Sequence, residues 1–110
     1  MPRGTELNAY KRDNCIVDFI MRHKGEASAV SGKEIAKHLN ENGFYTKTDD
    51  VHSLVNRVKI ERHLPICSAN YSGYFWSTSS KEIKQTIEIL QKRADGILRH
   101  IEHLKSFIIE

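Results

Sequence analysis

The stretch Ser31-Gly-Lys-Glu-Ile-Ala-Lys-His-Leu-Asn40 decides the fold, because it carries both a helix start signal and one apolar face. Ile35, Ala36 and Leu39 recur at helical spacing and share one side, while the lysines and the glutamate occupy the other. Ser31 with a glutamate three residues on is a capping box, and the Asn-Gly pair that follows the stretch is a stop signal. The stretch therefore predicts a short amphipathic helix.

A second helix is predicted from about Asp49 to Arg62, after a polar turn. Thr48 or Asp49 would be its N-cap, since both side chains can accept a hydrogen bond from a free backbone N–H group. Its apolar residues form one narrow stripe: Val51, Leu54, Val55 and Val58. Two short helices joined by a polar turn are therefore expected to pack together through these faces.

Residues 66–76 have the pattern of a β-hairpin, in which the runs ICSA and GYFW flank the turn NYS. Because strand side chains alternate, Tyr74 and Trp76 share one face, which we expect to pack on the helices, and Phe75 takes the other. The apolar segment Ala27–Val30 is expected to add a short first strand, because a lone hairpin of this length is unstable.

An N-terminal helix is predicted from Glu6 to Lys24, where Gly25 ends the apolar pattern. Leu7 and Tyr10 leave two interpretations open for residues 1–12. They extend this helix backward, or they form an arm that packs on a partner subunit.

A long C-terminal helix is predicted from Ser80 to Ile108, with a capping box at its start. Apolar residues recur three and four apart over more than three heptads, which is the pattern of a coiled coil. The helix would be about 43 Å long, so its far half would overhang a domain of this size. The predicted contact positions, with Leu98 widening the stripe, are Ile83, Ile87, Leu90, Ala94, Ile97, Leu98, Ile101, Leu104 and Ile108.

This stripe predicts a homodimer. The last helices would pair antiparallel, or pack on the partner's first helix near Phe19 and Ile20, in preference to a free parallel zipper, because a wide stripe suits more than one neighbour. The alternative is a helix folded back on its own domain.

Helix, turn, helix and hairpin in this order resemble the winged helix-turn-helix domain of bacterial and phage DNA-binding proteins, over roughly residues 14–76. The resemblance implies a mainly α fold with a small β-hairpin wing in residues 1–78, and a dimerisation helix in residues 79–110. It also implies a small dimeric transcriptional regulator, or a phage-type accessory factor, that binds double-stranded DNA in a sequence-specific manner and needs no cofactor.

The outward face of the second helix has the residue types of a recognition helix. Asparagine can pair with adenine and arginine with guanine, and lysines near a helix start can hold phosphates. The candidate DNA-binding residues, two of them in the hairpin turn, are Lys33, Lys37, Lys47, Thr48, His52, Ser53, Asn56, Arg57, Lys59, Asn70 and Tyr71.

Two features favour an alternative function, a protein-interaction module such as a phage-type inhibitor or adaptor that does not bind DNA. Asp49 and Asp50 would repel phosphate at the start of the second helix. Between Leu64 and Ser80 there is no Lys or Arg, although wings that contact DNA usually carry one.

The composition fits a globular protein, with 28% charged and 39% apolar residues and a net charge of +3. The two cysteines have no pairing pattern, and no apolar run reaches the roughly 20 residues of a membrane span, so we expect a cytoplasmic protein. Catalytic motifs are missing, so we expect no enzyme. His100 and His103 lack a third ligand nearby in sequence, so no metal site is predicted.

Overall fold

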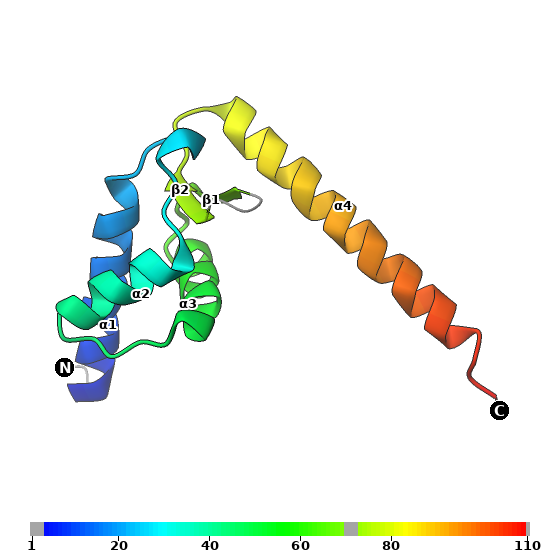
Figure 1. Ribbon diagram of the computed structural model, residues 1–110, viewed down its shortest axis with the longest axis horizontal. Helices are drawn as coiled ribbons and strands as arrows, with labels where there is room; N and C mark the ends of the chain where they lie inside the picture. The colour runs from blue at the N-terminus through cyan, green and yellow to red at the C-terminus, as the bar shows by residue number, and fades with distance from the viewer. Residues whose placement is uncertain (1–3, 70–72, 110) are drawn as a thin grey trace.

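The computed structural model describes residues 4–69 and 73–109, and shows a mainly helical protein with a small antiparallel hairpin (Figure 1). The elements in chain order are α1 (Gly4–Met21), the 3-10 helix η1 (Glu26–Ser28), α2 (Gly32–Glu41), α3 (Thr48–Glu61), β1 (Ile66–Ala69), β2 (Gly73–Trp76) and α4 (Ser80–Lys105). Helices α1, α2 and α3 pack on one another and on the hairpin, while α4 projects away from them.

The main core lies between the first three helices and one face of the hairpin. Each helix contributes the apolar residues that its periodicity places on one side. The fully or almost fully buried members are Ile16, Ile20, Val30, Ile35, Ala36, Leu39, Val51, Val55, Ile66 and Tyr74. Leu54, in the predicted stripe of α3, is partly buried against this core.

Helix α1 is one continuous helix, so the described part of residues 1–12 extends the first helix and forms no separate arm. Its Tyr10 ring lies under the guanidinium of Arg62, 5.2 Å from the ring centroid. The helix ends at Met21, before the predicted Lys24. His23 and Lys24 lie beside Trp76 instead, and the backbone N–H of Trp76 donates to the carbonyl of His23 (2.8 Å).

The turn between α2 and α3 is fixed by the side chain of Asn40. Its Nδ2 donates to the carbonyls of Ala36 (2.8 Å) and Thr46 (2.9 Å), and its Oδ1 accepts from the backbone N–H of Thr46 (3.0 Å). The serine half of the predicted capping box also forms, since Ser31 Oγ accepts from the backbone N–H of Glu34 at 3.1 Å. These bonds set the position at which α3 begins.

The predicted cap of α3 is wrong. The N-cap is Lys47, whose side chain makes no capping bond, and Thr48 is already helical. A side-chain hydrogen bond forms at Thr46 instead, just before the helix: its buried hydroxyl donates to the carbonyl of Phe44 (2.9 Å).

The hairpin pairs Ile66 with Trp76 and Ala69 with Gly73. The expected first strand at residues 27–30 is largely absent, because η1 occupies residues 26–28 and only Val30 remains extended enough to pair. Val30 and Tyr74 exchange two backbone hydrogen bonds, of 2.8 and 2.7 Å. This bridge, together with the one between Lys24 and Trp76, ties the hairpin to the chain before α2.

The two faces of β2 are buried differently from the prediction. Tyr74 faces the core as expected, but Trp76 is only partly buried. Phe75, assigned to the outer face, is 2% exposed and packs with Cys67 and Ala29 in a second small cluster. The start of α4 packs near β1, so the outer face of the hairpin is covered too.

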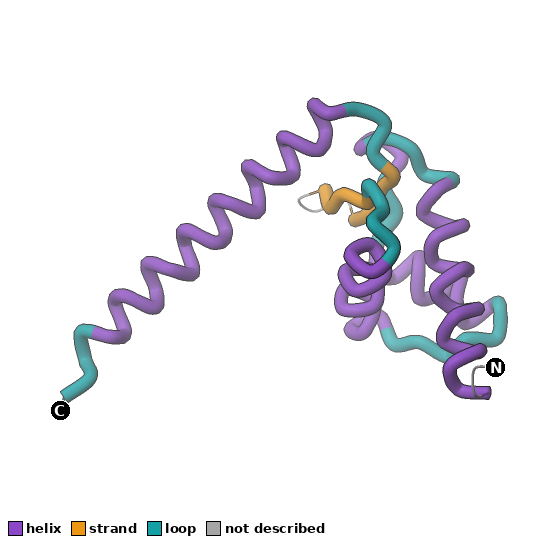
Figure 2. Tube along the Cα trace, turned by 180° about the vertical axis from the view of Figure 1, so that it is seen from behind, coloured by secondary structure: helices purple, strands orange, loops and turns teal. Residues whose placement is uncertain are grey.

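Helix α4 forms an extended arm in both views of the chain (Figures 1 and 2), so it does not fold back on its own domain. The Cα radius of gyration is 16.9 Å, against about 13 Å for a compact chain of this length. The helix ends at Lys105 instead of the predicted Ile108, and residues 107–109 leave it.

The base of the arm is held by Glu82. One of its carboxylate oxygens accepts from the backbone N–H of Thr78 (2.9 Å), and the other accepts from the backbone N–H of Glu26 (3.0 Å). Ser79 Oγ caps the helix by accepting from the backbone N–H of Glu82 (3.3 Å). The bonds from Thr78 and then Glu26 lower the pKa of Glu82 below 4.5.

Across the part of the chain that the structure describes, no helix has the combined length and apolar character that a bilayer crossing requires.

Candidate nucleic-acid interface

The face of α3 opposite the core is open to solvent. At 100° per residue, Asp49, Ser53, Asn56 and Ile60 lie on the side opposite the buried valines. Ser53 and Asp49 are exposed, whereas Asn56 is half-buried. Ser53 and Asn56, both candidate DNA-binding residues, therefore share this face.

His52 joins α3 to the hairpin. Its Nδ1 lies 3.0 Å from the hydroxyl oxygen of Tyr74, and its Nε2 lies 3.1 Å from Nδ2 of Asn56. If Asn56 donates to Nε2, the other ring nitrogen carries the proton and donates to Tyr74. The chain Asn56–His52–Tyr74 thus connects the outward face of α3 to a buried residue of β2. Burial raises the pKa of Tyr74, so its hydroxyl stays protonated at neutral pH.

Arg57 points toward α1 and not outward. Its guanidinium lies 3.3 Å from Oδ1 of Asp13, which is 8% exposed, and 3.8 Å from a carboxylate oxygen of Glu61. Arg12 also contacts Asp13, at 3.4 Å. Because a nearly buried carboxylate needs a positive partner, Arg57 has a structural role that competes with the predicted contact to guanine.

The lysines divide into two groups. Lys33 and Lys37 on α2, and Lys47 before α3, are exposed, with Lys37 3.9 Å from Glu41. Thr48 is exposed beside them. Lys59 is half-buried and lies at the other end of α3, beside the base of α4. The exposed group therefore lies on α2 and just before α3, and Lys59 lies apart from it at the far end of α3.

The predicted hairpin residues Asn70 and Tyr71 lie outside the described residues, so the structure gives no account of the wing tip.

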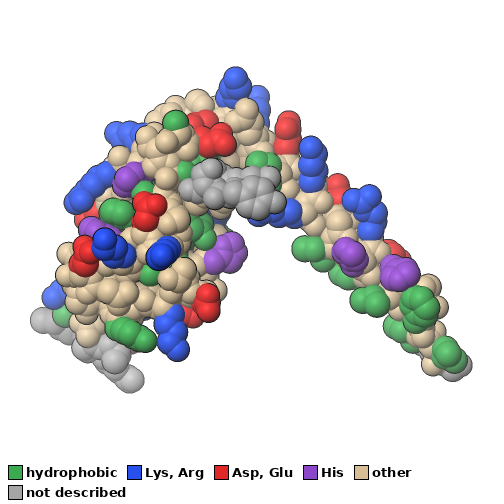
Figure 3. Space-filling view, in the orientation of Figure 1, with side chains coloured by type: hydrophobic (Ala, Val, Ile, Leu, Met, Phe, Trp, Pro, Cys, Tyr) green, Lys and Arg blue, Asp and Glu red, His purple; other side chains and the backbone are tan. Residues whose placement is uncertain are grey.

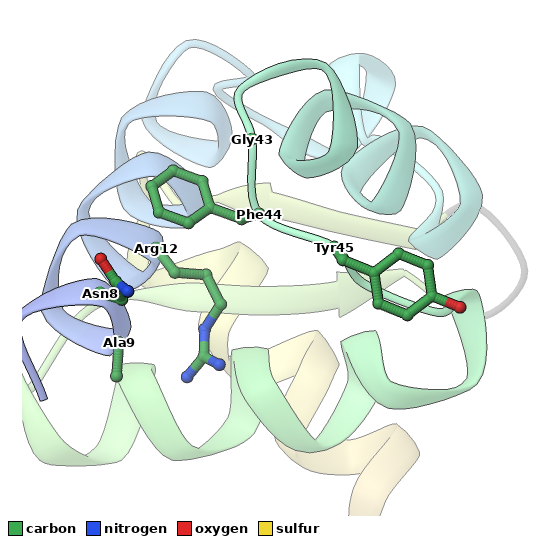
Figure 4. A pocket seen from close by; sticks show the side chains of 6 residues that line it. All are labelled: Asn8, Ala9, Arg12, Gly43, Phe44 and Tyr45. Atoms are coloured by element: carbon green, nitrogen blue, oxygen red, sulfur yellow. The ribbon is translucent and has the colours of Figure 1, made fainter. Parts of the chain in front are cut away.

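A pocket beside the α2–α3 turn was not foreseen from the sequence. It has a volume of about 340 Å³ and is lined by Asn8, Ala9 and Arg12 of α1 and by residues 43–45 (Figure 4). The figure shows Phe44 directed toward α1 and Tyr45 directed away from it, and Tyr45 is 84% exposed. The sequence signal was the pair of adjacent aromatics in a polar turn, of which only one can pack inward.

Ile60 was missed as well. It is 75% exposed and lies on the outward face of α3, next to Asn56 along the helix. Its spacing from Ser53, two turns, was sufficient to predict this.

Among the described residues, no group of three His, Cys, Asp or Glu side chains is arranged to hold a metal ion. Cys15 and Cys67 are free thiols. Burial raises the pKa of the Cys15 thiol, and the carboxylate of Asp18 adds to this, so Cys15 stays protonated near neutral pH.

The chain was compared with protein-family models, curated proteins and solved structures, and none of the three comparisons finds a match.

Proposed function

We propose that this chain is a winged helix-turn-helix protein that binds double-stranded DNA as a homodimer, as a small transcriptional regulator or phage-type accessory factor. The observation that carries the proposal is the outward face of α3, where Ser53 and Asn56 stand open to a groove of DNA. No cofactor or catalytic role is assigned. We expect the protein in the cytoplasm, where free cysteines stay reduced.

Within this proposal, different side chains contact bases, contact phosphates and position α3. Asn56 pairs with a base edge, and Ser53 contacts a base or a phosphate. Lys33, Lys37 and Lys47 hold phosphates, and Thr48 adds a hydroxyl near the free N–H groups at the start of α3. His52 sets the angle between α3 and the hairpin through its contact with Tyr74.

The proposed dimer is supported by the arm. Apart from the half-buried residue at the start of the stripe, the large apolar residues along α4 are not covered by the globular part of the same chain. Ile87 is 55% exposed and Ile97 is 60% exposed. Exposed apolar stripes of this length normally mark an interface.

The test is binding to random-sequence duplex DNA over a salt series, measured by fluorescence anisotropy. We expect log Kd to rise with log salt, and the double variant Lys37→Ala/Lys47→Ala, which removes two lysines from each protomer, to reduce the slope by about four for the dimer. Lys92→Ala, on the exposed far face of α4, removes the same kind of charge and should leave the slope unchanged. Equal slopes for all variants, or no binding at low salt, would contradict DNA binding.

Sequence specificity has its own test. Asn56→Ala should cost about 1–3 kcal/mol of affinity for a selected site while its binding to random DNA changes little. Equal affinity of wild type and variant for the selected site would remove α3 as the reader.

The alternative, a protein-interaction module, is favoured by one structural observation. Ile60 is 75% exposed on the same face as Asp49, so that face has an apolar and an acidic part. A wild-type protein that dimerises normally but does not bind DNA at low salt would make this alternative the better account.

A further inference from the structure

We infer that two copies of this chain pair their α4 helices antiparallel, and that residues Phe107–Ile109 of each copy dock in an apolar groove at the base of the other copy's arm. The inference rests on the proposed homodimer and adds the orientation of the helices and a second contact site.

The first observation is an unpartnered apolar stripe along α4. Its large members, from Ile83 to Ile108, are between 39% and 68% exposed. Figure 3 shows hydrophobic side chains gathered along the edge of the arm that faces the globular part. A second helix laid along this edge would cover the stripe and would approach the base of the arm.

The second observation is the register of the stripe. Its eight seam positions are symmetric about the point midway between Ala94 and Ile97. In an antiparallel pair, therefore, each a position within the helix meets a d position of the partner. The helical layers are Ile87 with Leu104, Leu90 with Ile101, and Ala94 with Ile97, and the remaining d residue, Ile83, comes opposite the segment that follows the partner's helix, where Ile108 lies.

Packing volume favours this orientation over a parallel one. In a parallel pair each seam residue faces the same residue of the partner. Ala94 would therefore face the partner's Ala94 between layers of isoleucine and leucine, and a void would form. In the antiparallel pair each Ala94 faces an isoleucine, and the layers have similar volumes. Facing charges do not oppose this strongly, because Lys105, which would approach the partner's Lys84, is already paired with Glu102 at 3.2 Å.

The third observation is a groove at the base of the arm, with a volume of about 580 Å³. Its apolar lining comes from Ile60 at the end of α3, Leu64 and Pro65 in the connection that follows, Ile66 at the start of β1, and Ile83 of α4. Ile83 thus belongs both to the groove and to the seam. The stripe and the groove form one continuous apolar surface.

The last observation is the C-terminal segment. After Lys105 the chain leaves the helix in a turn, and Phe107, Ile108 and Ile109 are 67%, 68% and 95% exposed. In the antiparallel register Ile108 lies opposite the partner's Ile83, which lines the groove. The exposed segment therefore arrives at the apolar groove, and a second copy of the chain supplies the occupant.

Orientation is tested by cysteine crosslinking in a Cys15→Ser/Cys67→Ala background that circular dichroism has shown to be folded. Ile87→Cys and Leu104→Cys are made in separate chains, one with a mass tag, and the two are mixed and oxidised. We expect mainly the mixed disulfide dimer. Dimers of each variant with itself, and few mixed ones, would mean parallel helices and would overturn the inference.

Groove docking is tested by sedimentation without DNA. Ile60→Asp changes an exposed residue, so the chain should fold, and we expect at least a tenfold weaker dimer. Ile108→Asp should have the same effect, and the two together should cost little more than either alone. Tyr45→Asp, at another exposed site outside the groove, should leave the dimer unchanged.

The outcomes separate the inference from the proposals beneath it. Dissociation by Ile97→Asp but not by Ile60→Asp or Ile108→Asp would keep the dimer and overturn groove docking. A wild-type chain that sediments as a 12.7 kDa monomer at micromolar concentration would overturn both. None of these measurements depends on whether the protein binds DNA.

Discussion

The imidazole of His52 on α3 and the phenol of Tyr74 on β2 are 3.0 Å apart, between Nδ1 and the hydroxyl oxygen. Tyr74 also exchanges two backbone hydrogen bonds with Val30. One residue of β2 therefore connects the hairpin, the segment before α2 and the exposed helix α3. A change in the position of the hairpin, of the segment before α2 or of α3 is therefore expected to shift the other two.

The hydroxyl of Tyr74 should make stability depend on pH in the alkaline range. Burial raises its pKa above the ordinary 10.0, so the unfolded chain ionises first. The stabilisation is present below pH 10 and is lost as the pH rises through the folded pKa. Tyr74→Phe should lower stability at pH 7 by about 0.5–1.5 kcal/mol but lose less between pH 10 and 11 in urea unfolding. Tyr45→Phe is the exposed control, and an equal alkaline loss in Tyr74→Phe would contradict the assignment.

Arg57→Ala should destabilise the fold, although the sequence alone indicated a purely DNA-facing residue whose loss leaves stability unchanged. The variant removes one of two guanidinium groups from the nearly buried Asp13. Because Arg57 is itself half exposed, we expect a modest loss of about 1 kcal/mol by denaturant unfolding. Glu61→Ala removes its more exposed partner and should stay within about 0.5 kcal/mol. Equal effects of the two variants would show that the contact with Asp13 is weak.

Phe75→Ala should destabilise more than Trp76→Ala, despite the larger side chain of Trp76. Phe75 is 2% exposed, whereas Trp76 is only partly buried. Removal of a buried phenylalanine costs about 3–5 kcal/mol, which is comparable with the whole stability of a small domain. Phe75→Leu, which leaves a smaller void, provides a folded variant for thermal melting. A larger loss for Trp76→Ala than for Phe75→Ala would reverse the assignment.

Two glycine-to-alanine substitutions should have opposite effects on stability. At Gly73, where φ is +98°, an added Cβ would lie 1.9 Å from the carbonyl oxygen of Val30. Gly73→Ala must break the bridge between Val30 and Tyr74, and we expect a loss of roughly 2 kcal/mol or more. Gly96 in α4 has open space at this position, so Gly96→Ala should gain up to about 1 kcal/mol of helix stability. Thermal melts of the two variants that move in the same direction would contradict this.

Glu82→Gln should weaken the attachment of α4 at neutral pH. The lowered pKa of Glu82 means that its carboxylate stabilises the fold above about pH 4.5. This contribution is lost as the pH falls through the folded pKa, so wild type and variant should converge in acid. Unfolding curves from pH 7 to pH 3 measure the difference, and Glu88→Gln on exposed α4 is the control. A constant difference at all pH values would mean that the charge of Glu82 has no role.

The sequence was most informative where the signal is local. The serine caps at Ser31 and Ser79 both form as predicted, because each requires only residues three apart. Helix periodicity likewise predicted the buried valines of α3. The exposed apolar stripe of α4 also followed from spacing, because its large residues after Ile83 within the helix are between 42% and 64% exposed.

Contacts between distant residues were not predictable in this way. Arg57 and Asp13 are 44 residues apart, and nothing in the helical pattern of α3 shows that α1 presents a carboxylate there. Phe75 takes the face opposite Tyr74, as alternation predicted, but alternation does not show that this second face is buried as well. The short strand before α2 was reduced to Val30, because Gly25 at φ +82° starts a 3-10 turn.

Because Glu82 fixes α4 to the globular part at one end only, a small rotation at that end moves the far end of the helix by a larger distance. From Glu82 to Lys105 the helix runs about 35 Å, so a rotation of about 10° at the pivot moves the far end by about 6 Å. That displacement is sideways to the helix axis and is about half the diameter of a helix with its side chains. If the hydrogen bonds of the Glu82 carboxylate changed in length by a few tenths of an ångström, the tip of α4 would therefore move much further, and the two chains of the proposed dimer would align differently.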